Sequence, residues 1–212
     1  MSSALAVKIC GMRDPKNIAE VATLLPDYMG FIFVESSPRF IGSSFDIGNL
    51  DSIASITKKI GVFANQDVMR IAESVARFGL DGVQLYGEES RNVVGTLRSL
   101  LPRIKIIKAI SVHSVSSFEL LQQYEDVVDF FLLDGKEPGS GKSFDWSILE
   151  SYPSKRDFFL AGGVGANAIH KIRSLAARLH TLRGIDINSQ VETSPGVKNI
   201  ELIREVLEGV RV

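Results

Sequence analysis

The chain has 212 residues, of which 45% are hydrophobic and 23% are charged, as is usual for a globular protein. Its 24 Lys and Arg against 25 Asp and Glu give a net charge of −1, which excludes the strongly basic surface of a general nucleic-acid or anionic-membrane binder. A single cysteine excludes an internal disulfide, no apolar run approaches the roughly 20 residues of a membrane span, and residues 1–4 lack the features of a signal peptide. We therefore expect a cytoplasmic protein that binds neither nucleic acid nor membrane.

Short apolar runs alternate with longer amphipathic segments along the whole chain. The runs are rich in β-branched and aromatic residues, as strands buried on both faces are, and they predict strands at 5–9, 28–34, 58–63, 81–85, 104–109, 129–133, 157–160 and 182–187. Helical spacing and capping residues, such as Asp14-Pro15, predict helices at 15–25, 46–56, 68–78, 89–101, 115–124, 165–178 and 199–209. The interval after the sixth strand has room for only one or two helical turns.

Eight strands, each followed by a helical segment and without a linker or repeat, predict one α/β domain over residues 1–212 with a parallel sheet. The strand count favours a closed (β/α)8 TIM barrel, although an open doubly wound sheet has the same alternation. In such barrels the functional side chains come from the carboxyl ends of several strands. The residues that directly follow each strand are therefore the candidates for a site.

Two proton-transferring side chains stand at strand ends. Cys10 follows the first strand, and Lys8 lies on the same face of that strand, where its charge favours the thiolate that a base requires. Asp134 follows the sixth strand and is a candidate acid. The alternatives are a buried structural cysteine and an aspartate that only caps a turn.

Anion-binding groups follow three further strands. Arg39, beside Pro38, is placed to hold a carboxylate or phosphate with two hydrogen bonds, although a solvated arginine is equally compatible. Loops after the seventh and eighth strands form the recurrent phosphate site of these barrels, and here they carry Gly162, Gly163, Asn188 and Ser189. A glycine pair alone is weak evidence, because ordinary turns also use it.

Two other chemistries are poorly supported. The histidines His113, His170 and His180 are scattered and show no metal-ligand spacing, so we expect no metal site. The run Gly141-Lys142-Ser143 suggests a P-loop, but that motif requires glycine where this chain has Lys136.

Several short motifs, weak singly but specific in series, resemble the phosphoribosylanthranilate isomerase family of tryptophan biosynthesis. They occur in the family's order and span nearly the whole chain: Val7-Lys8-Ile9-Cys10-Gly11, Ser37-Pro38-Arg39, Val83-Gln84-Leu85, Ile107-Lys108-Ala109, Leu133-Asp134, Gly139-Ser140-Gly141 with Phe144-Asp145-Trp146, Leu160-Ala161-Gly162-Gly163 and Pro195-Gly196-Val197-Lys198.

The resemblance implies a cofactor-free aldose–ketose isomerase with a small-molecule substrate. The reaction is the Amadori conversion of N-(5-phosphoribosyl)anthranilate to 1-(2-carboxyphenylamino)-1-deoxyribulose 5-phosphate. Carried onto this chain, Asp134 is the general acid that protonates the ribose ring oxygen, and Cys10 is the general base that removes the proton on carbon 2. Arg39 would hold the anthranilate side, Asp186 would orient the substrate, and the phosphate would be held by Gly162, Gly163, Asn188 and Ser189.

The chain departs from the family pattern at two places. Tyr86 stands where the family usually has histidine, so a role for a histidine is not available there. In the last loop Asn188 and Gln190 differ from the usual residues, and Gln190 replaces a glycine, which predicts a reshaped or strained phosphate loop.

Other functions stay open at this point. Lys8 and Lys108 leave room for an enzyme similar to indole-glycerol-phosphate synthase, and a sugar-phosphate isomerase or epimerase would use the same fold. A barrel that binds a phosphate ligand without turnover is a third possibility, against which stand Cys10 and Asp134. No interface signature is visible, so the sequence does not give the oligomeric state, and a barrel of this size is compatible with the monomer that we favour.

Overall fold

Eight parallel strands close into a barrel in chain order in the computed structural model, which describes residues 5–135 and 144–211. Each strand pairs with the next, and the last pairs with the first, with Lys8 opposite Asp186 in the closing register. The predicted (β/α)8 barrel and its eight strand positions are therefore confirmed. The strands are β1 (Ala6–Ile9), β2 (Tyr28–Ile32), β3 (Lys58–Phe63), β4 (Gly82–Leu85), β5 (Lys105–Ser111), β6 (Phe130–Asp134), β7 (Phe158–Leu160) and β8 (Leu182–Ile187).

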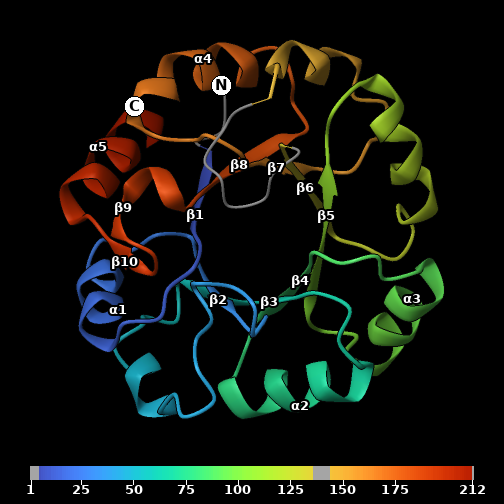
Figure 1. Ribbon diagram of the computed structural model, residues 1–212. Coiled ribbons are helices and arrows are strands. Elements are labelled where there is room, and N and C mark those ends of the chain that lie inside the picture. The colour runs from blue at the N-terminus through green and yellow to red at the C-terminus, as the bar shows by residue number, and fades with distance from the viewer. Residues whose placement is uncertain (1–4, 136–143, 212) are drawn as a thin grey trace.

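Helices form a ring around the barrel, which Figure 1 shows along the barrel axis with α5 meeting α1 where the ring closes. Asp14 begins α1 as predicted, because its carboxylate accepts the N–H of Asn17 at 2.8 Å. The α-helices are α1 (Pro15–Ala22), α2 (Val68–Phe78), α3 (Arg91–Leu100), α4 (Ile169–Ala176) and α5 (Ile200–Arg211), and short 3-10 helices are η1 (Ile47–Leu50), η2 (Val115–Gln123), η3 (Trp146–Ser151), η4 (Ala166–Ala168) and η5 (Ser189–Val191).

Two segments that were predicted to be helices form 3-10 helices instead of α-helices, and one of them is much shorter than predicted. The segment 46–56 contains only η1, since the Gly48-Asn49 pair disfavours an α-helix and the Asp46 carboxylate fixes a tight turn on the N–H of Gly48. The segment 115–124 is the 3-10 helix η2 instead of an α-helix. The motif residues 139–141 lie outside the described residues.

A small hairpin that the sequence did not predict follows η5. Its strands, β9 (Glu192–Ser194) and β10 (Val197–Lys198), are antiparallel and are joined by Pro195-Gly196, with Gly196 at a positive φ of 85°. Figure 1 places the hairpin beside α1. Two hydrogen bonds of 2.9 and 2.6 Å between Asn17 and the backbone of Lys198 fix it there.

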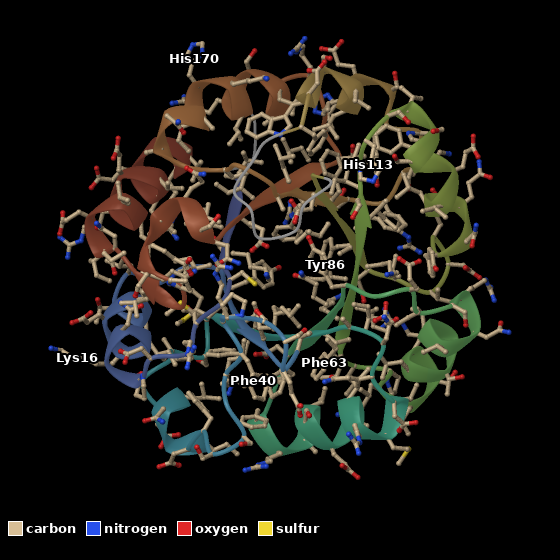
Figure 2. All side chains as sticks on the ribbon, in the orientation of Figure 1. Lys16, Phe40, Phe63, Tyr86, His113 and His170 are labelled. Atoms are coloured by element: carbon tan, nitrogen blue, oxygen red, sulfur yellow. The ribbon has the colours of Figure 1, made fainter. Side chains whose placement is uncertain are left out.

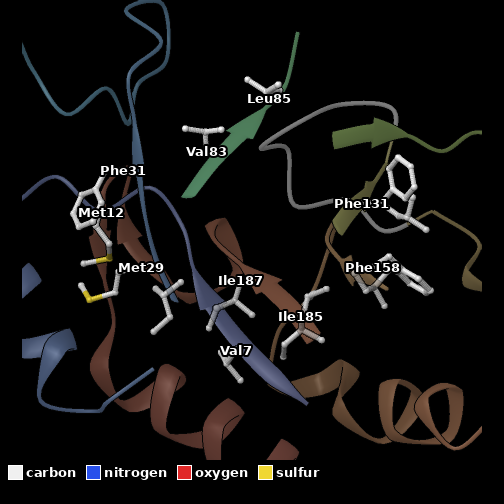
Figure 3. Close-up of a cluster of buried hydrophobic side chains, with 14 of the residues drawn as sticks. Val7, Met12, Met29, Phe31, Val83, Leu85, Phe131, Phe158, Ile185 and Ile187 are labelled. Atoms are coloured by element: carbon white, nitrogen blue, oxygen red, sulfur yellow. The ribbon is translucent and has the colours of Figure 1, made fainter. Parts of the chain in front are cut away.

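Alternation along each strand separates two apolar layers. Outward side chains such as Val7, Phe31 and Ile187 are fully buried between the barrel and its helices, as the close-up in Figure 3 shows. Inward side chains fill the barrel in layers, with Leu132 and Phe159 in the larger cluster. Cys10 belongs to a smaller inner cluster with Ile32 and Val62. The same alternation that packs Val7 and Ile9 outward therefore turns Lys8 and Cys10 inward.

Candidate active site

A cavity of about 490 Å³ is lined mainly by residues at or just beyond the carboxyl ends of the strands. Figure 2 shows Tyr86 near the barrel axis, whereas His170 lies at the outer rim. All eight residues predicted for the site line this cavity: Cys10, Arg39, Asp134, Gly162, Gly163, Asp186, Asn188 and Ser189. The fold thus brings together residues that are up to 179 positions apart in the sequence, because Cys10 and Ser189 both line this cavity.

The candidate base lies in a tightly packed charged corner. Cys10 directly follows β1, where its N–H donates to the carbonyl of Ile187 at 2.9 Å. The Lys8 ammonium is fully buried and donates to Asp186 at 2.9 Å. A Cβ at Gly30 would stand 2.9 Å from the Cys10 sulfur and 3.1 Å from the Lys8 nitrogen. Glycine is therefore required on β2 so that both side chains fit inside the barrel.

Burial and charge compete at the thiol. Burial raises the pKa of Cys10 above its ordinary value, and the positive charges of Lys8 and Lys198 oppose that rise. Burial also raises the pKa of Asp186, again against Lys8. Lys8 itself keeps its proton, since Asp186 and Cys10 raise its pKa more than burial lowers it. The predicted effect of Lys8 on the thiol is therefore present in sign, but burial outweighs it.

The candidate acid comes from another strand of the barrel and lines the same cavity. Asp134 is the last residue of β6, and its Oδ1 accepts the N–H of Gly135 at 2.7 Å. Its Oδ2 accepts a hydrogen bond from the Tyr86 hydroxyl. Burial raises the pKa of Asp134 although both hydrogen bonds oppose the rise. A carboxyl that holds its proton more tightly is suited to act as an acid near neutral pH.

Arg39 lies in a charged network that the sequence analysis missed. Its Nε and Nη2 donate to the carboxylate of Glu192 on β9 at 2.9 and 2.7 Å. Glu192 also accepts from Lys198 at 2.7 Å, and Lys198 donates at 2.7 Å to the side-chain oxygen of Asn188. Lys198 is the last residue of the Pro195-Gly196-Val197-Lys198 motif, and Glu192 lies in the segment that follows β8. The hairpin that brings them to Arg39 had no separate signal.

The loops predicted to bind phosphate differ in their backbone conformation. Gly162 and Gly163 have φ values of 77° and 70°, a region that L side chains rarely adopt. Ser189 and Gln190 lie in η5, in the neighbouring loop after β8. The prediction of strain at Gln190 is wrong, because positive φ outside glycine occurs in the described residues only at Leu25 and Asn65. The 3-10 turn accommodates a side chain at that position.

Gln84 lies on the inner face of β4, as alternation predicts, and lines the cavity. It is 1% exposed, and within the described part of the chain its Oε1 accepts no hydrogen bond. A buried acceptor without a donor is costly. It is therefore suited to receive a hydroxyl or N–H group of a molecule in the cavity.

In the described ranges, 5–135 and 144–211, no group of three or more His, Cys, Asp and Glu side chains could hold a metal ion. The same ranges contain no helix that is long and apolar enough to cross a membrane.

Comparison with known proteins assigns the family. The family model described as N-(5'-phosphoribosyl)anthranilate (PRA) isomerase matches residues 7–209. The protein of that name from Parabacteroides distasonis is 37% identical over 97% of this chain and 93% of its own length, and the one from Nostoc punctiforme is 35% identical over 96% and 97%. The chain belongs to the PRA isomerase family.

Solved structures agree. PRA isomerase from Thermotoga maritima superimposes with a TM-score of 0.85 at 27% identity, covering 97% of this chain and 98% of that one. A PRA isomerase in complex with reduced 1-(o-carboxyphenylamino)-1-deoxyribulose 5-phosphate gives 0.81 at 25% identity with the same coverage. The resemblance of the motifs to PRA isomerase is confirmed, and the synthase-like, epimerase-like and non-catalytic alternatives are not favoured.

Proposed function

We propose that this PRA isomerase converts N-(5-phosphoribosyl)anthranilate to 1-(2-carboxyphenylamino)-1-deoxyribulose 5-phosphate, with Asp134 as general acid and Cys10 as general base. The observation that supports these roles is that a buried thiol and a buried carboxyl, each with a raised pKa, line one cavity. An Amadori rearrangement requires one proton donor and one proton acceptor, and this pair supplies both.

In the first step, Asp134 gives its proton to the ribose ring oxygen. The bond between that oxygen and carbon 1 breaks, and the anthranilate nitrogen contributes its electron pair to form an iminium. The carboxylate left on Asp134 is stabilised by the two hydrogen bonds that it accepts, from Tyr86 and from the N–H of Gly135.

In the second step, the Cys10 thiolate removes the proton on carbon 2. The electrons of the C–H bond form the double bond between carbons 1 and 2, and the iminium nitrogen becomes neutral. The resulting enolamine tautomerises to the ketose. Because the iminium acidifies the adjacent C–H, a thiolate is a sufficient base, and the charges of Lys8 and Lys198 favour that thiolate against the effect of burial.

The two ends of the substrate meet different groups of the protein, backbone N–H groups at the phosphate and a side-chain cation at the anthranilate. The backbone N–H groups around Gly162, Gly163 and Ser189 suit a phosphate, whose charge they meet without a counter-ion. Arg39 lies on the wall where the anthranilate end would be, although its pairing with Glu192 leaves it a partly neutralised cation. Asp186, bound to Lys8, would orient the ribose hydroxyls.

Turnover of freshly generated phosphoribosylanthranilate, followed as loss of its fluorescence, tests the proposal. We expect fast loss with the parent protein, and a decrease of about 10²- to 10⁴-fold with Cys10→Ala and with Asp134→Asn, the range that general acid–base catalysis contributes. A matched control is Ser147→Ala, which removes a hydroxyl far from the cavity, where it binds Asp145 at 2.8 Å. Parental turnover in either cavity variant would contradict the assigned role.

We also propose that the protein is a cytoplasmic monomer. A thiol base requires reducing surroundings, and large exposed apolar side chains in the described ranges are spread over separate elements, including Ile56, Met69 and Val115. Light scattering of the purified protein that gives twice the mass of the 212-residue chain would overturn the monomer.

A further inference from the structure

Tyr86 lines the cavity, and no role in the site was predicted for it from the sequence. It directly follows β4, and its N–H donates to the carbonyl of Phe63 at 2.8 Å, which continues the ladder between β3 and β4 by one residue. Its ring packs against both inner apolar clusters of the barrel. Figure 2 shows the side chain near the barrel axis. The residue is therefore part of the barrel interior and not of a surface loop.

The backbone on both sides of Tyr86 is held by a buried lysine. Lys108 donates to the carbonyl of Leu85 at 3.3 Å and to that of Gly87 at 2.6 Å, and it pairs with Glu89 at 3.1 Å. Lys108 is only 3% exposed, and Glu89 in turn accepts the N–H of Gly87 at 3.1 Å. This arrangement accounts for Lys108 without a catalytic role. It also restricts how far the Tyr86 ring can move.

Within residues 5–135 and 144–211, the hydroxyl of Tyr86 makes one hydrogen bond, and its partner is the candidate acid. It donates to Oδ2 of Asp134, while Oδ1 is occupied by the N–H of Gly135. Burial, followed by the charge of Asp134, raises the pKa of Tyr86, so that the hydroxyl keeps its proton and acts as a donor. Both oxygens of the carboxyl group are thus fixed by donors that bind an anion better than a neutral acid.

We propose that Tyr86 is a positioning residue for the reaction: its hydroxyl holds the Asp134 carboxyl toward the cavity and stabilises the carboxylate that remains after the proton is transferred. At this position the family usually has histidine, and in this chain the hydroxyl of Tyr86 supplies the hydrogen-bond donor instead. The inference rests on the proposed role of Asp134 as general acid.

Other charged groups near the acid do not replace this contact. Asp186 on β8 raises the pKa of Asp134 by repulsion, and Lys8 on β1 lowers it, but both act at a distance and belong to the pair on the opposite side. Cys10 also raises the pKa of Tyr86. Among the described side chains, the Tyr86 hydroxyl alone donates a hydrogen bond to the Asp134 carboxyl.

The test is Tyr86→Phe, which removes the hydroxyl and keeps the ring. We expect kcat to fall about tenfold or more, as for the loss of a hydrogen bond to a charged group, with little change in KM. Infrared titration of the carboxyl band, assigned by difference from Asp134→Asn, should show a higher pKa for Asp134 in the variant than in the parent. A structural role alone would not move that band.

Tyr28→Phe is the matched control, because Tyr28 packs inside the barrel on Phe159 and has no contact with Asp134. It should leave kcat and the Asp134 band unchanged. An unchanged kcat in Tyr86→Phe, or a lowered kcat with the parental pKa of Asp134, would overturn the inference about Tyr86. If Asp134→Asn keeps parental turnover, the acid role itself fails; if Asp134→Asn is inactive and Tyr86→Phe is not impaired, only the present inference fails.

Discussion

The cavity combines two groups of charged residues that are built differently. The barrel group, Lys8, Cys10, Asp134 and Asp186, lies on the strands or directly after them. The hairpin group, Arg39, Glu192 and Lys198, is held by a loop and by the β9–β10 hairpin outside the barrel. Burial raises the pKa values of Cys10, Asp134 and Asp186 in the first group. In the second group the pairing with Arg39 and Lys198 lowers the pKa of Glu192 against the effect of burial. We infer that the barrel group controls chemistry and the hairpin group controls binding.

The largest effect on activity is expected in the barrel group, for Lys8→Met. Without the ammonium, the pKa of the Cys10 thiol rises further, the thiolate fraction at neutral pH falls, and kcat should drop about 100-fold. Asp186 loses its partner, which costs about 3–5 kcal/mol of stability for a broken buried pair. Because the chain has one cysteine, alkylation by iodoacetamide as a function of pH reports the thiol directly.

The double variant Lys8→Met, Asp186→Asn separates stability from chemistry. Removing both charges should restore much of the melting temperature, since no uncompensated charge stays buried. Because the charge of Asp186 raises the pKa of Cys10, its removal should also return part of the alkylation rate. An alkylation rate that stays parental in Lys8→Met alone would refute the electrostatic effect of Lys8 on Cys10.

An intermediate effect is expected in the hairpin group for Arg39→Lys. The charge is kept, but the fork that meets the Glu192 carboxylate through two nitrogens is lost. We expect KM to rise about tenfold, the loss of a charge-assisted hydrogen bond, with kcat within a few-fold of the parent. Steady-state kinetics measure this division. A fall in kcat at constant KM would place Arg39 with the chemistry and not with binding.

The smallest effect is expected for Gln190→Gly, which introduces the residue that the resembling sequences usually have. Since the backbone at this position is not in the left-handed region, glycine relieves no strain and costs about 0.5–1 kcal/mol of conformational freedom. Turnover should change by less than about twofold. Gln190→Ala is the control for the loss of the side chain. A large gain in kcat/KM with glycine alone would show that the loop is strained after all.

The sequence predicts the positions of the barrel group better than those of the hairpin group. Alternation in short apolar strands placed Cys10 and Lys8 on one inner face and put Asp134 at a strand end, because period-two patterns depend only on neighbouring residues. The Arg39–Glu192 pair joins positions 153 apart through the hairpin of residues 192–198, for which the sequence contained only a Pro-Gly turn. No local pattern specifies such a partner.

Tyr86 illustrates the same limit within the barrel. Its place on the inner face followed from Gln84, two residues earlier, and could be predicted. That its hydroxyl reaches Asp134, 48 positions later, depends on the order in which β4, β5 and β6 curve around the barrel. The 3-10 character of η1 and η2 was missed for a different reason, because helical spacing alone does not distinguish a short, weakly propagating helix from an α-helix.

The ion pair between Lys8 and Asp186 also joins the first strand to the last, across the line where the barrel closes. The two residues are 178 positions apart, so the lysine has no counter-ion until nearly the entire chain has been synthesised and β8 has docked. Closing so long a loop is entropically costly and slows folding. A nascent or truncated chain that ends before β8 lacks Asp186, Asn188 and Ser189 and cannot close the barrel around Cys10. Completion of the fold and assembly of the cavity therefore coincide.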